Sequence, residues 1–67
     1  MYIVIELQTD PAGAVAHIVT ACEDRNTAES RFHQILAAAA VSELPKHAAV
    51  MVTEEGLLLR NECYGHG

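Results

Sequence analysis

The first 23 residues alternate between hydrophobic and polar positions in a way that predicts a β-hairpin. Residues 2–8, YIVIELQ, are rich in β-branched side chains and alternate with a period of two, as a strand does. Residues 9–14, TDPAGA, have turn chemistry, because Pro11 presets its own φ and Gly13 accepts a positive φ. Residues 15–23, VAHIVTACE, then predict the second strand of the hairpin.

The period of two also divides the first predicted strand into two faces. One face carries Ile3, Ile5 and Leu7, and the other carries Tyr2, Val4, Glu6 and Gln8. We expect the face with Tyr2 and Val4 to lie opposite the helix, where Met51 or Leu58 adds to its apolar surface.

Residues 24–40, DRNTAESRFHQILAAAA, change to the spacing of a helix. Asn26 is a good N-cap, and Glu29 three positions later completes a pattern like a capping box. The predicted helix runs from about residue 27 to about residue 42, and Pro45 follows its end. Its core-facing stripe recurs at intervals of three and four residues: Ala28, Phe32, Ile35, Leu36 and Ala39.

The remaining residues predict a second hairpin. Residues 47–53, HAAVMVT, and 57–64, LLLRNECY, read as strands on either side of a tight turn at 54–56, EEG. The predicted fold is therefore α+β with the order ββαββ. A four-stranded antiparallel sheet with one helix packed on one face, in a single domain over residues 1–67, is the economical arrangement.

Length bears on how such a fold is stabilised. A chain of 67 residues buries only about 60% of the surface that its unfolded form exposes, so oligomerisation is an expected source of extra stability. The start of the chain does not have the pattern of a signal peptide, and no apolar run approaches the ~18 residues of a membrane span. We expect a cytoplasmic protein without membrane contact, in the host cytoplasm if a phage encodes it. Cys22 and Cys63 are then reduced.

Four consecutive alanines, residues 37–40, end the predicted helix. Consecutive helical residues point in different directions around the axis, so some of these methyl groups face away from the chain's own sheet. Small side chains on an outer helix surface allow close approach of a second subunit, which favours a homo-oligomer. Alanine is also the best helix former, and this property alone can account for the run.

Charge limits the classes of partner. The chain has four basic and nine acidic residues and a net charge of −5. Its lysine and arginines are scattered along the sequence, so it lacks the basic surface that nucleic-acid binding requires. We expect no nucleic-acid partner.

One stretch has the chemistry of an anion site. Arg25, Asn26 and Thr27 stand where the helix begins, and free backbone N–H groups at a helix N-terminus attract anions. An arginine there can clamp a phosphate or carboxylate, and Arg31 lies one turn further on. Tyr64 is a further candidate, because its ring can stack on a base. The alternative is an ordinary cap, with Asp24 and Glu29 as competing negative charge.

Metal and catalytic sites are not indicated. Cys63-x-x-His66 has a spacing that suits zinc, but two further ligands are missing. Pairs such as Cys63 with His47, or Ser30 with His33, lie in no recognisable catalytic motif. We therefore expect no metal, no cofactor and no enzymatic activity.

Five segments carry a resemblance to a known group: YIVIELQT, DRNTAES, LAAAAVS, HAAVM and the closing ECYGH. Over nearly its full length the chain resembles a family of short uncharacterised proteins encoded in bacterial and bacteriophage genomes. The resemblance implies a phage or mobile-element setting. Compact phage proteins of this size include multimeric sponges that sequester nucleotide immune signals, and small virion or regulatory proteins.

Two functional hypotheses follow. The first is a non-enzymatic homo-oligomer that holds a small anionic, nucleotide-like ligand between subunits, as an anti-defence sponge does, with Arg25, Asn26, Thr27, Arg31 and Tyr64 as the binding residues. The second is a phage structural or accessory protein whose apolar face docks on a protein partner and which binds no small molecule.

Overall fold

The computed structural model describes residues 1–66 and contains four strands and one helix. The elements follow the order β1 (Tyr2–Thr9), β2 (Val15–Cys22), α1 (Arg25–Ala40), β3 (Lys46–Thr53) and β4 (Leu58–Gly65). The predicted α+β fold of type ββαββ is confirmed, and each predicted strand lies within one residue of its observed bounds. The first turn closes as predicted, with Gly13 at φ 90°.

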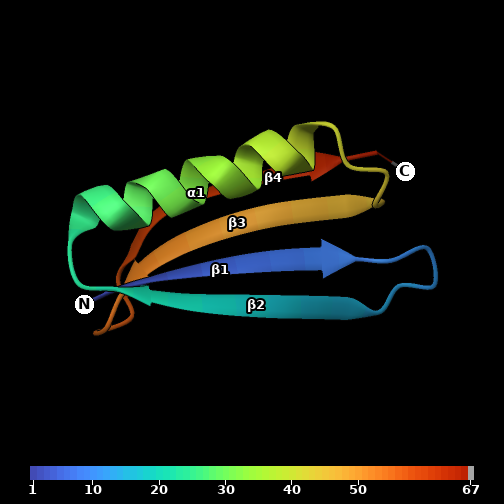
Figure 1. Ribbon diagram of the computed structural model, residues 1–67. Coiled ribbons are helices and arrows are strands. Elements are labelled where there is room, and N and C mark those ends of the chain that lie inside the picture. The colour runs from blue at the N-terminus through green and yellow to red at the C-terminus, as the bar shows by residue number, and fades with distance from the viewer. Residues whose placement is uncertain (67) are drawn as a thin grey trace.

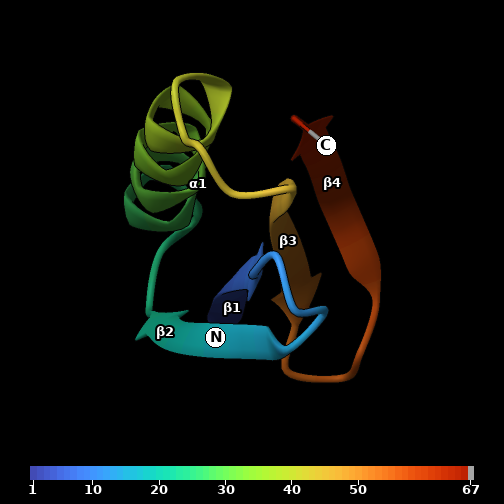
Figure 2. The ribbon, with the colours of Figure 1, turned by 90° about the vertical axis from the view of Figure 1, so that its right-hand side faces the viewer.

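The sheet is antiparallel throughout, with the strand order β2-β1-β3-β4. Strands β1 and β3 are therefore central, and β2 and β4 form the two edges (Figure 1). Strand directions rotate steadily across the sheet, so that β2 runs across the lower part of Figure 2 while β4 rises at the right. The helix lies on one side of the sheet, and no element of residues 1–66 covers the other side.

The helix begins two residues earlier than predicted and ends two residues earlier. Its N-cap is Asp24, whose carboxylate accepts a hydrogen bond from the Thr27 backbone N–H at 2.8 Å. The predicted cap at Asn26 is wrong, because Asn26 lies within the first turn. Glu29 does not close a capping box either, since its carboxylate accepts two hydrogen bonds from Arg60 of β4, at 3.0 and 3.1 Å. No helix within residues 1–66 is long and apolar enough to cross a membrane.

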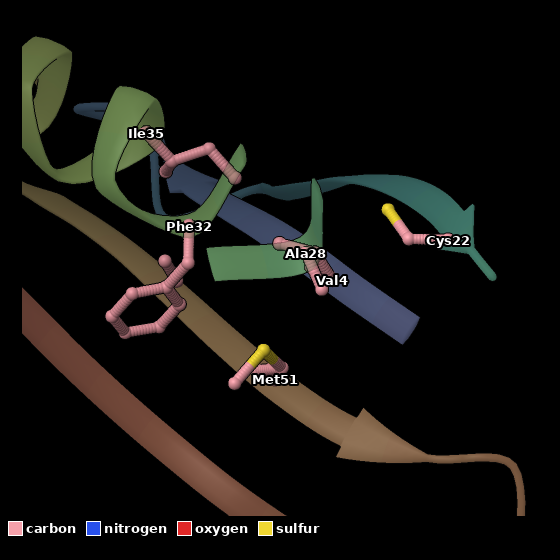
Figure 3. Close-up of a cluster of buried hydrophobic side chains, with 7 residues drawn as sticks. Val4, Cys22, Ala28, Phe32, Ile35 and Met51 are labelled. Carbon is pink, nitrogen blue, oxygen red and sulfur yellow. The ribbon is translucent and has the colours of Figure 1, made fainter. Parts of the chain in front are cut away.

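The core lies between the helix and the two central strands. Phe32 reaches from the helix toward β3, where Met51 lies, and Ala28 sits above Val4 of β1 (Figure 3). The Arg60 guanidinium covers the Phe32 ring at 5.2 Å from its centroid. The predicted helix stripe is confirmed, because Ala28, Phe32, Ile35 and Ala39 are buried and Leu36 is half-buried against the cluster. Cys22 is buried in the same core, whereas Cys63 is exposed, and both thiols are free.

The predicted assignment of the two sheet faces is wrong for Tyr2 and Val4, and of the alternatives Met51 and Leu58 it holds for Leu58. Tyr2, Val4 and Met51 pack against the helix, not on the opposite face. Only Leu58 lies on the uncovered face, aligned with Val52. A short period-two strand does not itself say which of its apolar faces the helix will cover.

Candidate functional site

A buried polar cluster lies under the helix, on the same face of the sheet as the core. Glu6 of β1 and His47 of β3 are 8% and 5% exposed. Strand register places them on one face. Glu6 is aligned with the buried Ala49, and His47 is aligned with Gln8, which lies two residues after Glu6 on the same side of β1. Arg31 reaches the cluster from the middle of the helix. The Glu6 carboxylate therefore meets three side chains: Gln8 of β1, Arg31 of α1 and His47 of β3.

The Glu6 carboxylate is the centre of this cluster. Its Oε2 lies 2.6 Å from His47 Nε2 and accepts a hydrogen bond from Gln8 Nε2 at 2.9 Å, while its Oε1 accepts one from Arg31 Nη2 at 3.4 Å. Burial raises the pKa of Glu6, but hydrogen bonds from Gln8 and His47, with the charges of His47 and Arg31, outweigh burial and hold the pKa below its ordinary value. The carboxylate is thus ionised in the folded protein at neutral pH.

The second ring nitrogen of His47, Nδ1, is fully buried, and no group among the described residues pairs with it. A carboxylate beside an imidazole also occurs in hydrolytic triads, but there the other ring nitrogen meets a nucleophile. Within residues 1–66 nothing bonds to this nitrogen, and no pocket leads to it. The cluster can hold a charge and fix the position of the helix on the sheet.

The predicted ligand site is spread over the molecule. Arg25, Asn26 and Thr27 are all exposed in the first turn of the helix. Arg31 is half-buried and turned toward Glu6. Tyr64 lies at the other end of the helix, where its ring stacks on His66, and His66 Nε2 lies 2.8 Å from the Ala39 carbonyl oxygen. A helix of 16 residues is about 24 Å long, so one subunit does not bring the five residues together.

The helix N-terminus is already partly occupied by the chain's own negative charge. Asp24 accepts the hydrogen bond of the Thr27 N–H. Hydrogen bonding by the Thr27 side chain, and then by its backbone N–H, lowers the pKa of the Asp24 carboxyl. An anionic ligand would therefore meet a carboxylate beside the free N–H groups of the first turn. Residues 1–66 also contain no cluster of three or more side chains suited to a metal ion.

The largest feature is the uncovered side of the sheet, here called the open face. Because paired residues of antiparallel strands point to the same side, register defines it. Its apolar members, in chain order, are Ile3, Ile5, Leu7, Val15, Val19, Ala21, Ala48, Val50, Val52 and Leu58. Its polar members are Thr9, His17, Lys46, Asn61 and Cys63. Ile5 and Val50 are directly paired at its centre, flanked by Val19 and Asn61 in the same row.

Acidic side chains are excluded from the open face, although they make up nine of 67 residues. Glu6 and Glu62 are both aligned with the buried Ala49, which places them on the helix side. The other seven lie in the helix or in the connecting segments: Asp10, Glu23, Asp24, Glu29, Glu43, Glu54 and Glu55. Lys46, at one end of β3, is the only charged residue of the face. The net charge of −5 is therefore carried elsewhere on the surface.

Comparisons of the chain with protein-family models, with curated proteins and with solved structures find no match. The resemblance to a bacterial and phage family stays a prediction. Function is inferred from the chain's own residues.

Sequence reasoning missed both the buried cluster and the extent of the open face. The signal for the cluster was a glutamate in the third position of a strand face that begins with Tyr2 and Val4. The signal for the open face was the third strand, where Ala48, Val50 and Val52 continue the apolar pattern of Ile3 and its neighbours. Both signals become readable only once strand order and register are known.

Proposed function

We propose that this protein is a non-enzymatic interaction protein that acts as a homo-oligomer, and that its open face packs on the open face of a second copy. The single observation that carries the proposal is the open face, an apolar surface without acidic residues in an acidic chain. Apolar surfaces of this kind mark interaction sites. Because the face lacks acidic side chains, two copies can approach each other through it without like-charge repulsion.

The architecture supports the same partner. Stable domains bury each apolar face of a sheet against another layer. One helix covers one side of this sheet, so a second sheet is the missing layer, and two copies packed face to face form a sandwich with about 10 Å between the sheets. The helices then lie outside, with the acidic residues on the solvent surface.

The area of the open face determines the size of this contact. Four strands about 4.8 Å apart, with eight residues at about 3.3 Å each, cover about 19 by 26 Å, or about 500 Å² per subunit. Two faces together bury about 1,000 Å², which is at the lower limit for a specific protein interface. Interfaces of this size are typical of weak or transient contacts, so for the sandwich alone we expect association in the micromolar range or weaker.

The ligand hypothesis remains a finer proposal within this one. A nucleotide-like anion bound at Arg25, Asn26 and Thr27 would need a second subunit to supply Tyr64, because the two ends of the helix are far apart. An assembly is thus a precondition of that site. Docking of the open face on a different protein is the alternative to self-association.

Val50→Lys tests the proposal. Val50 stands at the centre of the open face, where a lysine would be desolvated in the sandwich and solvated in the separate subunit. Val41→Lys is the matched control, because Val41 is 82% exposed beyond the helix end and off the face. Sedimentation velocity should show an assembled wild type and Val41→Lys, and a smaller Val50→Lys species. A monomeric wild type, or an unchanged mass for Val50→Lys, would refute self-association through this face.

A further inference from the structure

The two edges of the sheet differ in how they are protected. Edge strands of natural proteins carry charges, bulges or a covering element, because bare edges pair with other strands. Strand β4 has such features: a bulge opposite Met51 and Val52, and the charged side chains Arg60 and Glu62. Strand β2, VAHIVTAC, has no charged residue, no proline and no bulge in its pairing with β1.

The outward hydrogen-bonding groups of β2 can be assigned from the turn. The Asp10 N–H donates to the Ala14 carbonyl oxygen at 2.9 Å, so residues 10 and 14 form a hydrogen-bonded pair. In an antiparallel ladder such pairs alternate with pairs that do not exchange bonds. Counting along the register, the residues of β2 whose N–H and C=O groups point away from β1 are Val15, His17, Val19 and Ala21. Within residues 1–66 these groups meet no other strand.

Both side-chain faces of β2 are also bare at its centre. Ile18 is aligned with Glu6, which places it on the helix side, yet it is 47% exposed because the helix does not cover it. Val19 on the open face is 56% exposed. The middle of β2 thus presents an unpaired backbone with apolar side chains above and below.

We propose that β2 pairs antiparallel with β2 of a second copy, across a two-fold axis near Ile18 and Val19. The axis of such a pair is perpendicular to the sheet, so the two sheets join into one of eight strands with both helices on the same side. This interface is additional to the proposed face-to-face contact. Backbone N–H and C=O groups of β2 form it, whereas side chains of the open face form the face-to-face contact. A second copy of β2 fits this edge, because β2 contains no Asp, Glu, Lys or Arg side chain that would repel an identical strand.

Area links the two interfaces. Joining two sheets at β2 doubles the continuous open face to about 1,000 Å². Two such dimers packed face to face bury about 2,000 Å², which lies within the range of stable protein interfaces, whereas single subunits reach only the lower limit. The expected assembly is a tetramer, built as a dimer of edge-paired dimers.

Hydrogen exchange of the wild-type protein, followed by NMR, tests the edge directly. The matched comparison lies within the same molecule. The His66 N–H donates to the Pro45 carbonyl oxygen, so the same alternation makes the amides of Asn61 and Cys63 point outward from β4. The amides of His17, Val19 and Ala21 should exchange about tenfold more slowly than these two, or slower still. Equal, fast exchange at both edges in the assembled protein would overturn the edge pairing.

Val19→Pro and Gly65→Pro form a second pair of tests. Each substitution removes one outward N–H from an edge strand and leaves the ladder to the central strand intact, and Gly65 lies at the end of β4, away from the centre of the open face. Val19→Pro should halve the mass of the assembly, whereas Gly65→Pro should not change it. Unchanged mass for Val19→Pro would overturn the edge pairing and leave the face-to-face proposal standing. If Val50→Lys loses assembly, Val19→Pro does not, and the wild-type β2 amides are unprotected, the edge pairing is also overturned and the face-to-face proposal stands.

Discussion

Replacing Glu6 by glutamine should destabilise the protein through the buried polar cluster. Gln8 and His47 bond to the same oxygen, at 2.9 and 2.6 Å, so the amide can keep both bonds by turning its NH2 group toward Arg31, but its neutral oxygen accepts them more weakly than the carboxylate does. A hydrogen bond to a charged group contributes about 1.5–3 kcal/mol and a neutral one about 0.5–1.5 kcal/mol, so losing the charge costs about 1–3 kcal/mol. The pair with Arg31 adds little, because it is 3.4 Å long and that side chain is one-third exposed. A domain of this size has a free energy of unfolding of about 3–10 kcal/mol, so the loss is large.

The pH dependence has a definite sign. The pKa of Glu6 is lower in the folded protein than its ordinary value of 4.5. Its ionised form therefore contributes stability that is fully present above pH 4.5 and is lost as the pH falls through the lowered folded value. Glutamine does not titrate, so the difference between wild type and Glu6→Gln should be greatest near pH 7 and should shrink below pH 4.5.

Urea unfolding followed by circular dichroism measures this difference. Protein concentration must be fixed, because assembly makes stability concentration-dependent. Glu62→Gln is the control: Glu62 lies in the same cross-strand row but is exposed, and its change should stay within about 0.5 kcal/mol. Equal stability of Glu6→Gln and wild type at pH 7, or a deficit that does not change with pH, would refute the assigned role of the cluster.

Two further predictions concern the start of the helix. Asp24→Ala should lower the melting temperature, because it removes the acceptor of the Thr27 N–H, whereas Asn26→Ala should leave it nearly unchanged; the reverse order would restore the cap predicted from the sequence. A panel of nucleotides and cyclic nucleotides should raise the melting temperature if the ligand hypothesis holds, by an amount equivalent to about 2.7 kcal/mol at a hundredfold excess over the dissociation constant. That shift should vanish in Arg25→Ala and persist in Arg60→Ala, and a flat panel would leave only the interaction function.

The order and type of every element could be read from the sequence because each signal is local. Alternation in YIVIELQ, the Asp-Pro-x-Gly turn and the helical stripe through Phe32 involve neighbours in the chain. The helix cap was misplaced because Asp24 and Asn26 are both good caps, and the choice depends on where the chain leaves β2.

What the sequence could not show depends on pairing between distant residues. Ile3, Ile5 and Leu7 form the more apolar face of β1, and local reasoning assigned them to the core. The helix instead covers the face with Val4 and Glu6, on which Met51 and Ala49 of β3 are in register with those two residues. The Glu6–His47 pair joins residues 41 positions apart and follows from that same register. Nothing within either strand alone predicts it.

The side of the sheet that the helix covers has a consequence for assembly. The covered face contains a buried carboxylate and a buried imidazole, which an arginine reaches from the helix, whereas the open face contains one charged residue at its margin. Burying charge costs free energy that hydrogen bonds only partly recover, so the helix side contributes less stability than a fully apolar core would. Most of the sheet's purely apolar surface remains on the open face, and assembly is the step that buries it. Stability of the subunit and formation of the oligomer should therefore be coupled, so that open-face and β2-edge variants lose more stability than the change in their cross-strand contacts within the subunit accounts for.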